Sequence, residues 1–164
     1  MRSKIKKMII GLILITIGIG IDQLTKYLAF RYLDFGRDYK CIPGVFRFYL
    51  VENTGAAWGI LPNQLWFFIA ITSVALVFLG YLAKYFDLKE NPLFSASYIL
   101  ITIGTIGNFI DRVFNKGIVR DFVTFDFMSF PSFNFADMTL TVGVIFLAFD
   151  ILFGQSGATW IKSG

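Results

Sequence analysis

The sequence contains no histidine and only one cysteine, Cys41, among its 164 residues. Without an imidazole, Ser-His-Asp and Cys-His nucleophilic mechanisms are excluded. A single cysteine also excludes an internal disulfide framework, and the usual zinc ligand sets are missing with it. We therefore expect a protein that works with neither a metal nor a cofactor.

Charged residues are also scarce, at 16% of the chain, whereas 56% is hydrophobic and the mean hydropathy is +0.68. Soluble domains carry about 25% charged residues, and so short a chain cannot hide this much apolar surface in one core. The net charge of +4 comes without the basic and aromatic stripe that is typical of nucleic-acid binding. The composition predicts a membrane protein that contacts lipid and no nucleic acid.

Long apolar stretches make up most of the sequence. About 20 apolar residues suffice to cross the hydrocarbon layer of a membrane as a helix. Two stretches, 65–83 and 91–110, have no charged residue, and two further stretches are interrupted by aspartates or a lysine. We predict a mainly α-helical membrane protein with four transmembrane helices, forming a single integral membrane domain over residues 1–164. The expected spans are approximately 8–30, 65–85, 91–112 and 135–153.

The first segment has a second interpretation, because Lys4, Lys6 and Lys7 before a short apolar run are typical of a cleaved signal peptide. Against it, no small-residue cleavage site follows. In addition, Asp22 and Lys26 lie four residues apart on one helical face, in the order that favours pairing. The basic N-terminal residues predict a cytoplasmic N-terminus. An even number of spans then returns the C-terminus to the cytoplasm.

Two segments on the outer side alternate between the two faces of a strand. Residues 46–51 have a period of two, and residues 119–125 follow the same pattern more weakly. We expect a small extracytoplasmic β element at the membrane interface, which could form a platform over a site at that depth.

Polar residues converge near this outer boundary. At 1.5 Å per helical residue, Asp22 lies about 21 Å into the first span and Asn108 about 26 Å into the third. An ionisable residue in a membrane is costly and is by default a candidate for a functional site. The group comprises four acidic residues, two basic residues and three asparagines: Asp22, Asp111, Asp121, Asp137, Lys26, Arg112, Asn53, Asn108 and Asn134.

Several of these residues also have a structural interpretation. Asp22 and Lys26 could compensate each other's charge, and Asp111 beside Arg112 resembles an ion pair at a helix end. Asp137 could simply favour a helix N-terminus, where a carboxylate gains roughly 0.3 to 1 kcal/mol from the dipole. Asp121 could be a solvated turn residue. Gly104 and Gly107 fit positions of close helix packing.

Carboxylates are the best remaining catalytic groups once histidine is excluded. When two share a site, repulsion raises one pKa, so that one is protonated while the other is ionised. One carboxylate can then take a proton from water while the other hydrogen-bonds the scissile carbonyl. Asp121 and Asp137 are the candidate pair, because the non-helical segment between them permits a fold-back approach.

Five sequence blocks carry a resemblance to a known family, and they cover nearly the whole chain. The blocks are Asp22-Gln-Leu-Thr-Lys26, Asn53-Thr-Gly-Ala-Ala-Trp-Gly59, Gly104-Thr-Ile-Gly-Asn-Phe-Ile-Asp-Arg112, Gly117-Ile-Val-Arg-Asp-Phe122 and Phe133-Asn-Phe-Ala-Asp137. In order and spacing they resemble bacterial lipoprotein signal peptidase, the signal peptidase II family. The resemblance implies an aspartyl endopeptidase of the bacterial cytoplasmic (inner) membrane, with its active site near the outer face.

The resemblance also implies a substrate and residue roles. The substrates would be diacylglyceryl-modified prolipoproteins, cleaved on the N-terminal side of the lipidated cysteine, and the inhibitor would be a globomycin-type cyclic peptide. Asp121 and Asp137 match the catalytic pair. The positions that match residues shaping or supporting the site are Asn53, Asn108, Arg112 and Asn134. The positions that match stabilising residues are Asp22, Lys26, Gly107 and Asp111.

Two other functions fit a small polytopic protein. A transporter or channel would distribute charge through the membrane, whereas here the second span has none and the polar residues crowd into one layer. A non-catalytic assembly protein would use the polar cluster only to bind its helices together. Cleavage of a lipidated prolipoprotein by the purified protein separates the protease from both.

Overall fold

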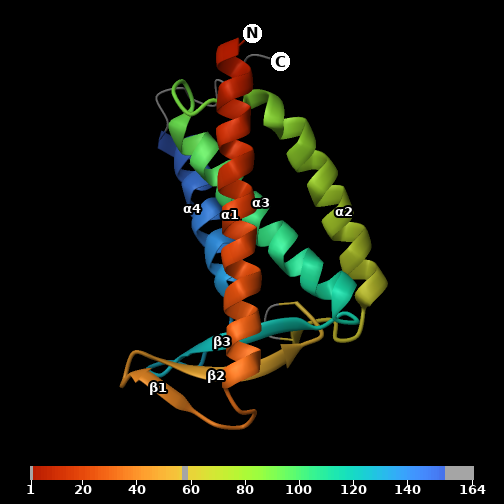
Figure 1. Cartoon of the computed structure of the whole chain (residues 1–164), viewed down its shortest axis with the longest axis vertical. Helices are drawn as coiled ribbons and strands as arrows, with labels where there is room; N and C mark the ends of the chain where they lie inside the picture. Colours follow the sequence, from red (N-terminus) through yellow and green to blue (C-terminus); the bar gives the residue numbers. More distant parts are fainter. Residues whose placement is uncertain (1, 57–58, 154–164) are drawn as a thin grey trace.

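The computed structural model describes residues 2–56 and 59–153 (Figure 1). Within this part of the chain, four helices are long and apolar enough to cross a membrane, and they are accompanied by a small sheet. The helices are α1 (Arg2–Tyr32), α2 (Leu65–Leu82), α3 (Pro92–Phe114) and α4 (Phe135–Phe153), with a short 3-10 helix η2 (Ala83–Tyr85) after α2. The predicted fold class, a mainly helical membrane protein with an added β element, is confirmed.

Helix α3 forms the centre of the bundle. Half of its apolar stretch is buried inside the protein, against 6% of the stretch in α2. Helix α2 contains no charged residue, and its middle stands apart from the other helices, whereas its first turns lie beside the end of α3 (Figure 1). Its side chains therefore face lipid over most of their surface, while α3 packs against α1, α2 and α4.

Helix α1 is longer than a membrane crossing requires. Its 31 residues span about 46 Å at 1.5 Å per residue, whereas the hydrocarbon layer is about 30 Å thick. The last turns therefore extend beyond the other helices to the sheet (Figure 1). There Ala29 packs with Leu50 and Phe122 in a buried apolar cluster.

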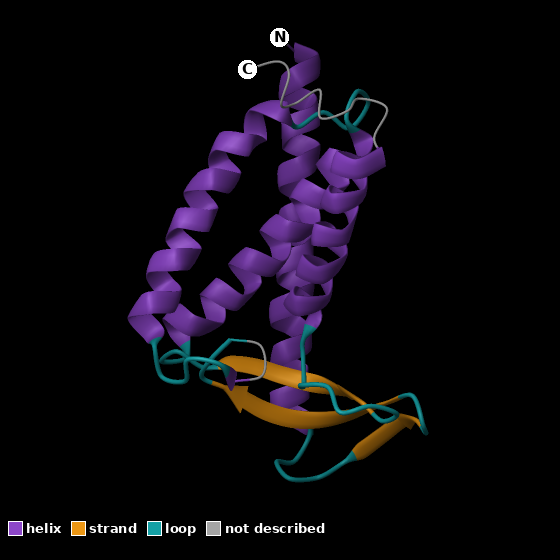
Figure 2. Cartoon of the chain, turned by 180° about the vertical axis from the view of Figure 1, so that it is seen from behind, coloured by secondary structure: helices purple, strands orange, loops and turns teal. Residues whose placement is uncertain are grey.

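The sheet lies across one end of the bundle, at the opposite end from the start of α1 (Figure 2). Its strands are β1 (Tyr39–Ile42), β2 (Phe46–Asn53) and β3 (Val119–Phe125), antiparallel and in the order β1-β2-β3. The alternation at 46–51 and at 119–125 correctly predicted β2 and β3. Strand β1 was not predicted, because its four residues are mostly exposed and show no alternation of burial.

Close packing of α3 against α1 and α4 depends on glycine. A Cβ atom added to Gly107 would lie 2.5 Å from Oδ2 of Asp22 and 3.0 Å from Cβ of Ala136. A Cβ atom on Gly104 would meet the carbonyl oxygen of Ala136. The absence of side chains at these two positions lets the helices approach closely around the polar cluster.

We expect Gly107→Ala to lower stability, because the added methyl group overlaps the carboxylate of Asp22 and presses on Cβ of Ala136; overpacking of this kind costs about 1 to 3 kcal/mol. Gly80→Ala is the matched control, since Gly80 lies on α2 with nothing within 4 Å of the added atom. Thermal unfolding of both variants in detergent measures the difference. Equal melting temperatures would contradict the packing argument.

Candidate active site

A buried ionic network ties α1 to α3 and β3. The side chains of Lys26, Asp22 and Asp111 are completely buried. Nζ of Lys26 lies 2.9 Å from Oδ2 of Asp22 and 3.4 Å from Oδ2 of Asp111. Arg120 from β3 adds the second positive charge, donating from Nη2 to Oδ1 of Asp111 over 2.7 Å. Two carboxylates and two cations therefore compensate each other's charge inside the protein.

The partner of Asp111 differs from the sequence-based interpretation. The expected ion pair joined Asp111 to its neighbour Arg112, but in the structure Asp111 pairs with Lys26 and Arg120. The reason is helical geometry, because successive residues of a helix point about 100° apart. Arg112 instead donates from Nη2 to the carbonyl oxygen of Gly55 over 3.1 Å.

Two members of the network, Gln23 and Arg120, were missed from the sequence. Gln23 donates to Oδ2 of Asp22 and to the carbonyl oxygen of Gly107, and its Oε1 accepts from Arg120. Both residues lie inside the sequence blocks described above, next to residues that were singled out. The alternation of strand residues could have pointed to Arg120. In a strand, Arg120 and Asp121 point to opposite faces, so their side chains reach different parts of the polar cluster.

Asp121 lies on β3 at the point where the sheet meets the bundle, and its residue is only 2% exposed. Its partner across the ladder is Val51, which places Asn53 diagonally opposite on β2. Nδ2 of Asn53 donates to Oδ2 of Asp121 over 3.1 Å. Asp121 is therefore a buried carboxyl group held by the sheet, and the solvated turn position considered from the sequence is wrong.

Asp137 lies in the first turn of α4 and forms a reciprocal cap with Asn134. Oδ1 of Asn134 accepts from the backbone N–H of Asp137 over 3.0 Å, and Oδ2 of Asp137 accepts from the backbone N–H of Asn134 over 3.0 Å. This pattern is a capping box, in which two otherwise unpaired backbone donors at a helix start are satisfied by side chains. The start of α4 thus fixes the position of the Asp137 carboxyl group.

Two asparagines link the aspartates to each other. Nδ2 of Asn134 donates to Oδ1 of Asp121 over 2.6 Å, so that Asn134 contacts both carboxyl groups. Nδ2 of Asn108 on α3 donates to Oδ1 of Asp137 over 2.7 Å. Three segments that are distant in sequence therefore bring Asp121 and Asp137 to either side of one asparagine.

The two carboxyl groups interact electrostatically. Burial raises the pKa of Asp121 to about 7, and the negative charge of Asp137 contributes to the rise. The amide donors of Asn53 and Asn134, and the more distant charge of Lys26, oppose it. One member of the pair therefore holds its proton near neutral pH, which is the condition that two carboxylates need to act as acid and base.

We expect Asp137→Asn to lower the pKa of Asp121, because the variant removes the neighbouring negative charge. Titration of aspartate carboxyl groups by ¹³C NMR measures the change. Asp126→Asn is the control: Asp126 follows β3 and is bound by Arg47 and the N–H of Gly44, outside this site. An unchanged Asp121 titration in Asp137→Asn would show that the carboxyl groups do not interact.

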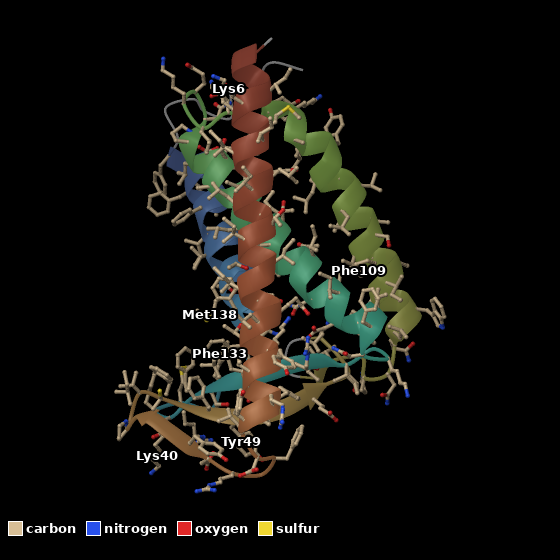
Figure 3. The ribbon with its side chains drawn as sticks, in the orientation of Figure 1. Lys6, Lys40, Tyr49, Phe109, Phe133 and Met138 are labelled. Atoms are coloured by element: carbon tan, nitrogen blue, oxygen red, sulfur yellow. The ribbon has the colours of Figure 1, made fainter. Side chains whose placement is uncertain are left out.

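A cavity of about 570 Å³ opens beside both aspartates. Its polar lining comes from β2, α3, β3, the segment after β3 and α4, and its apolar lining comes mainly from β3, the segment 130–133 and α4. Figure 3 shows Phe133 and Met138 in this region. The polar residues at the cavity are Asn53, Asn108, Arg112, Asp121, Ser132, Asp137 and Thr141. A polar chain segment attached to an apolar one fits this mixed lining.

Arg112 brings a positive charge to the cavity wall. Its guanidinium lies over the ring of Phe68 on α2, 4.7 Å from the centroid. Its Nη2 binds Gly55, whereas its buried Nε has no hydrogen-bond partner in the described part of the chain. The side chain is thus held in place by α2 and by the loop after β2, with one donor unused.

Comparison with known proteins assigns the chain to a family. The family model described as signal peptidase (SPase) II matches residues 14–153. The chain belongs to the signal peptidase II family. This family is a group of aspartic-type peptidases, so the protein is a hydrolase, and the transporter and assembly interpretations are set aside.

Relatives named lipoprotein signal peptidase support the signal peptidase II assignment. One from Brevibacillus brevis (strain 47 / JCM 6285 / NBRC 100599) is 42% identical over 134 residues, covering 81% of this chain and 88% of the relative. One from Bacillus pumilus (strain SAFR-032) is 43% identical, covering 82% and 86%. A solved bacterial membrane enzyme superposes with a TM-score of 0.81 at 33% identity, covering 91% of this chain and 90% of the other.

The structure brings together all the residues that the sequence singled out, in two layers. The candidate active site of this signal peptidase II member contains Asp121, Asp137, Asn53, Asn108, Asn134 and Arg112. Directly behind it lies the network of Asp22, Lys26 and Asp111, with Gly107 packed against Asp22. Lys26 joins the layers, because its Nζ also donates to Oδ1 of Asn108 over 3.1 Å.

Proposed function

We propose that this protein removes the signal peptide from diacylglyceryl-modified prolipoproteins by hydrolysing the bond on the N-terminal side of the lipidated cysteine. Asp121 and Asp137 act as the catalytic pair. The observation that carries the proposal is the bridge through Asn134, which contacts both carboxyl groups at the wall of one cavity. The names of the curated relatives, lipoprotein signal peptidase, support the substrate class.

The two carboxyl groups have different surroundings, which supports different roles. Asp121 holds a proton near neutral pH because its pKa is raised to about 7. Asp137 accepts hydrogen bonds at both oxygens and lies in the first turn of α4, where the helix dipole favours a negative charge. We therefore assign the protonated role to Asp121 and the ionised role to Asp137.

Hydrolysis then proceeds through a tetrahedral intermediate. Asp137 takes a proton from a water molecule, whose oxygen bonds to the scissile carbonyl carbon, while Asp121 gives its proton to the carbonyl oxygen. When the C–N bond breaks, the amine of the cysteine takes the proton from Asp137, and Asp121 recovers a proton from the hydroxyl group that becomes the new carboxylic acid. Both aspartates return to their starting states, and general acid-base catalysis of this kind contributes about 10² to 10⁴ in rate.

The depth of the cavity suits a substrate that is itself a membrane helix. Asp121 lies in β3 and Asp137 in the first turn of α4. Figure 2 shows the sheet at the end of the bundle opposite the start of the chain, which is the basic start of α1. Positive residues favour the cytoplasmic side. We therefore place the N- and C-termini in the cytoplasm and the active site near the outer face of the bacterial cytoplasmic membrane.

The lining of the cavity supports the finer assignment of ligands. Apolar side chains of α4 and of the segment 130–133 flank the polar wall. The lipid chains on the cysteine can contact these apolar side chains, and the polar backbone beside the cysteine can contact the polar wall. A globomycin-type cyclic peptide, with both kinds of surface, is proposed to occupy the same cavity and compete with the substrate.

Cleavage by the purified protein tests this function. The protein in detergent is incubated with a diacylglyceryl-modified prolipoprotein and, separately, with the same prolipoprotein carrying Ser in place of the modified Cys. Mass spectrometry should find a product that starts at the lipidated cysteine, no cleavage of the unlipidated control, and inhibition by globomycin. An intact lipidated substrate, or a cut at another bond, would contradict the proposal.

A further inference from the structure

The ammonium group of Lys26 makes one contact that charge compensation does not explain. Its ion pairs with Asp22 and Asp111 balance charge inside the bundle. Its third contact, to Oδ1 of Asn108 over 3.1 Å, is directed toward the active site. Asn108 is the residue that binds Asp137 through its other amide atom, Nδ2, over 2.7 Å.

The two ends of an asparagine amide have nearly the same shape, so that only hydrogen bonding decides which end points where. With Oδ1 of Asn108 toward Lys26, Nδ2 donates to the carboxylate of Asp137. In the flipped orientation, the amide NH₂ would face the ammonium group and the amide oxygen would face the carboxylate. Both contacts would then be repulsive.

Asn134 supports the same orientation, because its Nδ2 also donates to Oδ1 of Asn108, over 3.2 Å. This second donor is neutral and is shared with Asp121. Lys26 is a full charge, completely buried, and hydrogen bonds to charged groups are stronger than neutral ones. The ammonium group is therefore the stronger of the two donors that hold Oδ1 of Asn108.

We propose that Lys26 is a positioning residue for the hydrolysis, which acts through Asn108: its ammonium group fixes the amide of Asn108 so that Nδ2 holds the carboxylate of Asp137. The inference rests on the proposed function of the aspartate pair and adds to it a second role for a residue of the buried network. The charge of Lys26 also lowers the pKa of Asp121, so the same group influences both members of the pair.

A pair of variants separates positioning from folding. Asp22→Asn keeps Lys26, which retains its contacts with Asp111 and Asn108. Lys26→Met/Asp22→Asn removes the ammonium group and leaves the remaining network balanced, since Asp111 still pairs with Arg120. The wild type is run in the same assay, so that failure of the proposed function appears as an inactive wild type and is distinct from failure of this inference.

We expect the double variant to have a kcat at least tenfold below that of Asp22→Asn, with KM within twofold and similar melting temperatures. The charged groups that influence Asp121 from the packed elements are Asp137 on α4, Arg112 on α3 and Lys26 on α1. Loss of the Lys26 charge raises the pKa of Asp121. Because Asp121 acts in its protonated form, the pH at which kcat falls on the alkaline side moves higher. Equal kcat values and superimposable pH profiles would overturn the inference.

Asn108→Asp is a second test, which leaves Lys26 unchanged and applies even if the double variant does not fold. The new carboxylate can accept from Lys26 and Asn134 but cannot donate to Asp137. We expect kcat to fall at least tenfold in protein that still unfolds cooperatively, with a lower melting temperature because a second carboxylate now faces Asp137. More than half of the wild-type kcat would overturn the inference, because the donor that Lys26 is proposed to orient would then be dispensable.

Discussion

Asp121→Asn is expected to abolish cleavage while raising the melting temperature at pH 8. Asparagine cannot hold and release the proton that the pair shares, so cleavage should fall by about 10³ or more, the scale of general acid-base catalysis. At the same time, the variant removes a buried negative charge next to Asp137. The residue that we propose for the reaction is thus one that the folded protein accommodates at a cost in stability.

The stability that Asp121→Asn gains over the wild type depends on pH. The pKa of Asp121 is about 7 in the folded protein, against an ordinary value of 3.8 for an aspartate, so the folded state binds the extra proton between these pH values. The free energy of unfolding therefore decreases as pH rises from about 4 to 7, by up to about 4 kcal/mol at 1.36 kcal/mol per pKa unit. The advantage of Asp121→Asn should be complete above pH 7 and absent below pH 4.

Thermal unfolding at pH 4 and pH 8, with cleavage of the lipidated prolipoprotein at pH 7, checks both parts. Asp126→Asn is the control, because the backbone N–H of Gly44 and the side chain of Arg47 lower the pKa of Asp126 and outweigh the opposing effect of burial. A lower melting temperature of Asp121→Asn at pH 8 would argue against an electrostatic cost, and retained cleavage would remove Asp121 from the mechanism.

The largest loss of stability is expected for the single variant Lys26→Met. It leaves Asp22 completely buried without a cation, and breaking a buried ion pair in this way costs about 3 to 5 kcal/mol. Lys7→Met is the matched control. Lys7 pairs with Asp87 over 2.7 Å, but both side chains are about a quarter exposed, so water can solvate the remaining charge.

Unfolding in detergent, followed by tryptophan fluorescence or differential scanning, compares the two variants. The pKa of Asp87 is lowered to about 2, chiefly by its hydrogen bond with Lys7, so the control also removes a lysine from a carboxylate. The two pairs differ in burial, and Lys26 also contacts Asp111 and Asn108. Similar melting temperatures for Lys26→Met and Lys7→Met would show that burial of the network does not determine its contribution.

The membrane made much of the fold predictable. Lipid requires every span to be a long apolar helix, so hydropathy alone located α2 and α3. The polar interruptions in α1 and α4 were tolerated because they face the interior, where Asp22 and Lys26 pair and Asp137 caps its helix. The alternation of β2 and β3 was visible for the same reason, since each strand has one face on the bundle.

What could not be predicted depends on contacts between distant segments. Adjacency suggested an Asp111–Arg112 pair, although helical geometry directs these neighbours to different partners. Gln23 meets Arg120 only because α1 and β3 cross at this depth, and no local pattern contains that information. The spacing between Asp121 and Asp137 likewise permitted an approach, whereas the bridge through Asn134 became evident only in three dimensions.

The capping box at the start of α4 has a consequence for regulation by local unfolding. Asp137 stabilises the first turn of α4 through the same carboxylate that we assign to the reaction. Unfolding of this one turn therefore displaces the carboxylate and inactivates the enzyme while the rest of the bundle stays folded. Local openings of this size occur far more often than global unfolding. Hydrogen exchange at the first amides of α4 should therefore report the fraction of molecules that are competent at any moment.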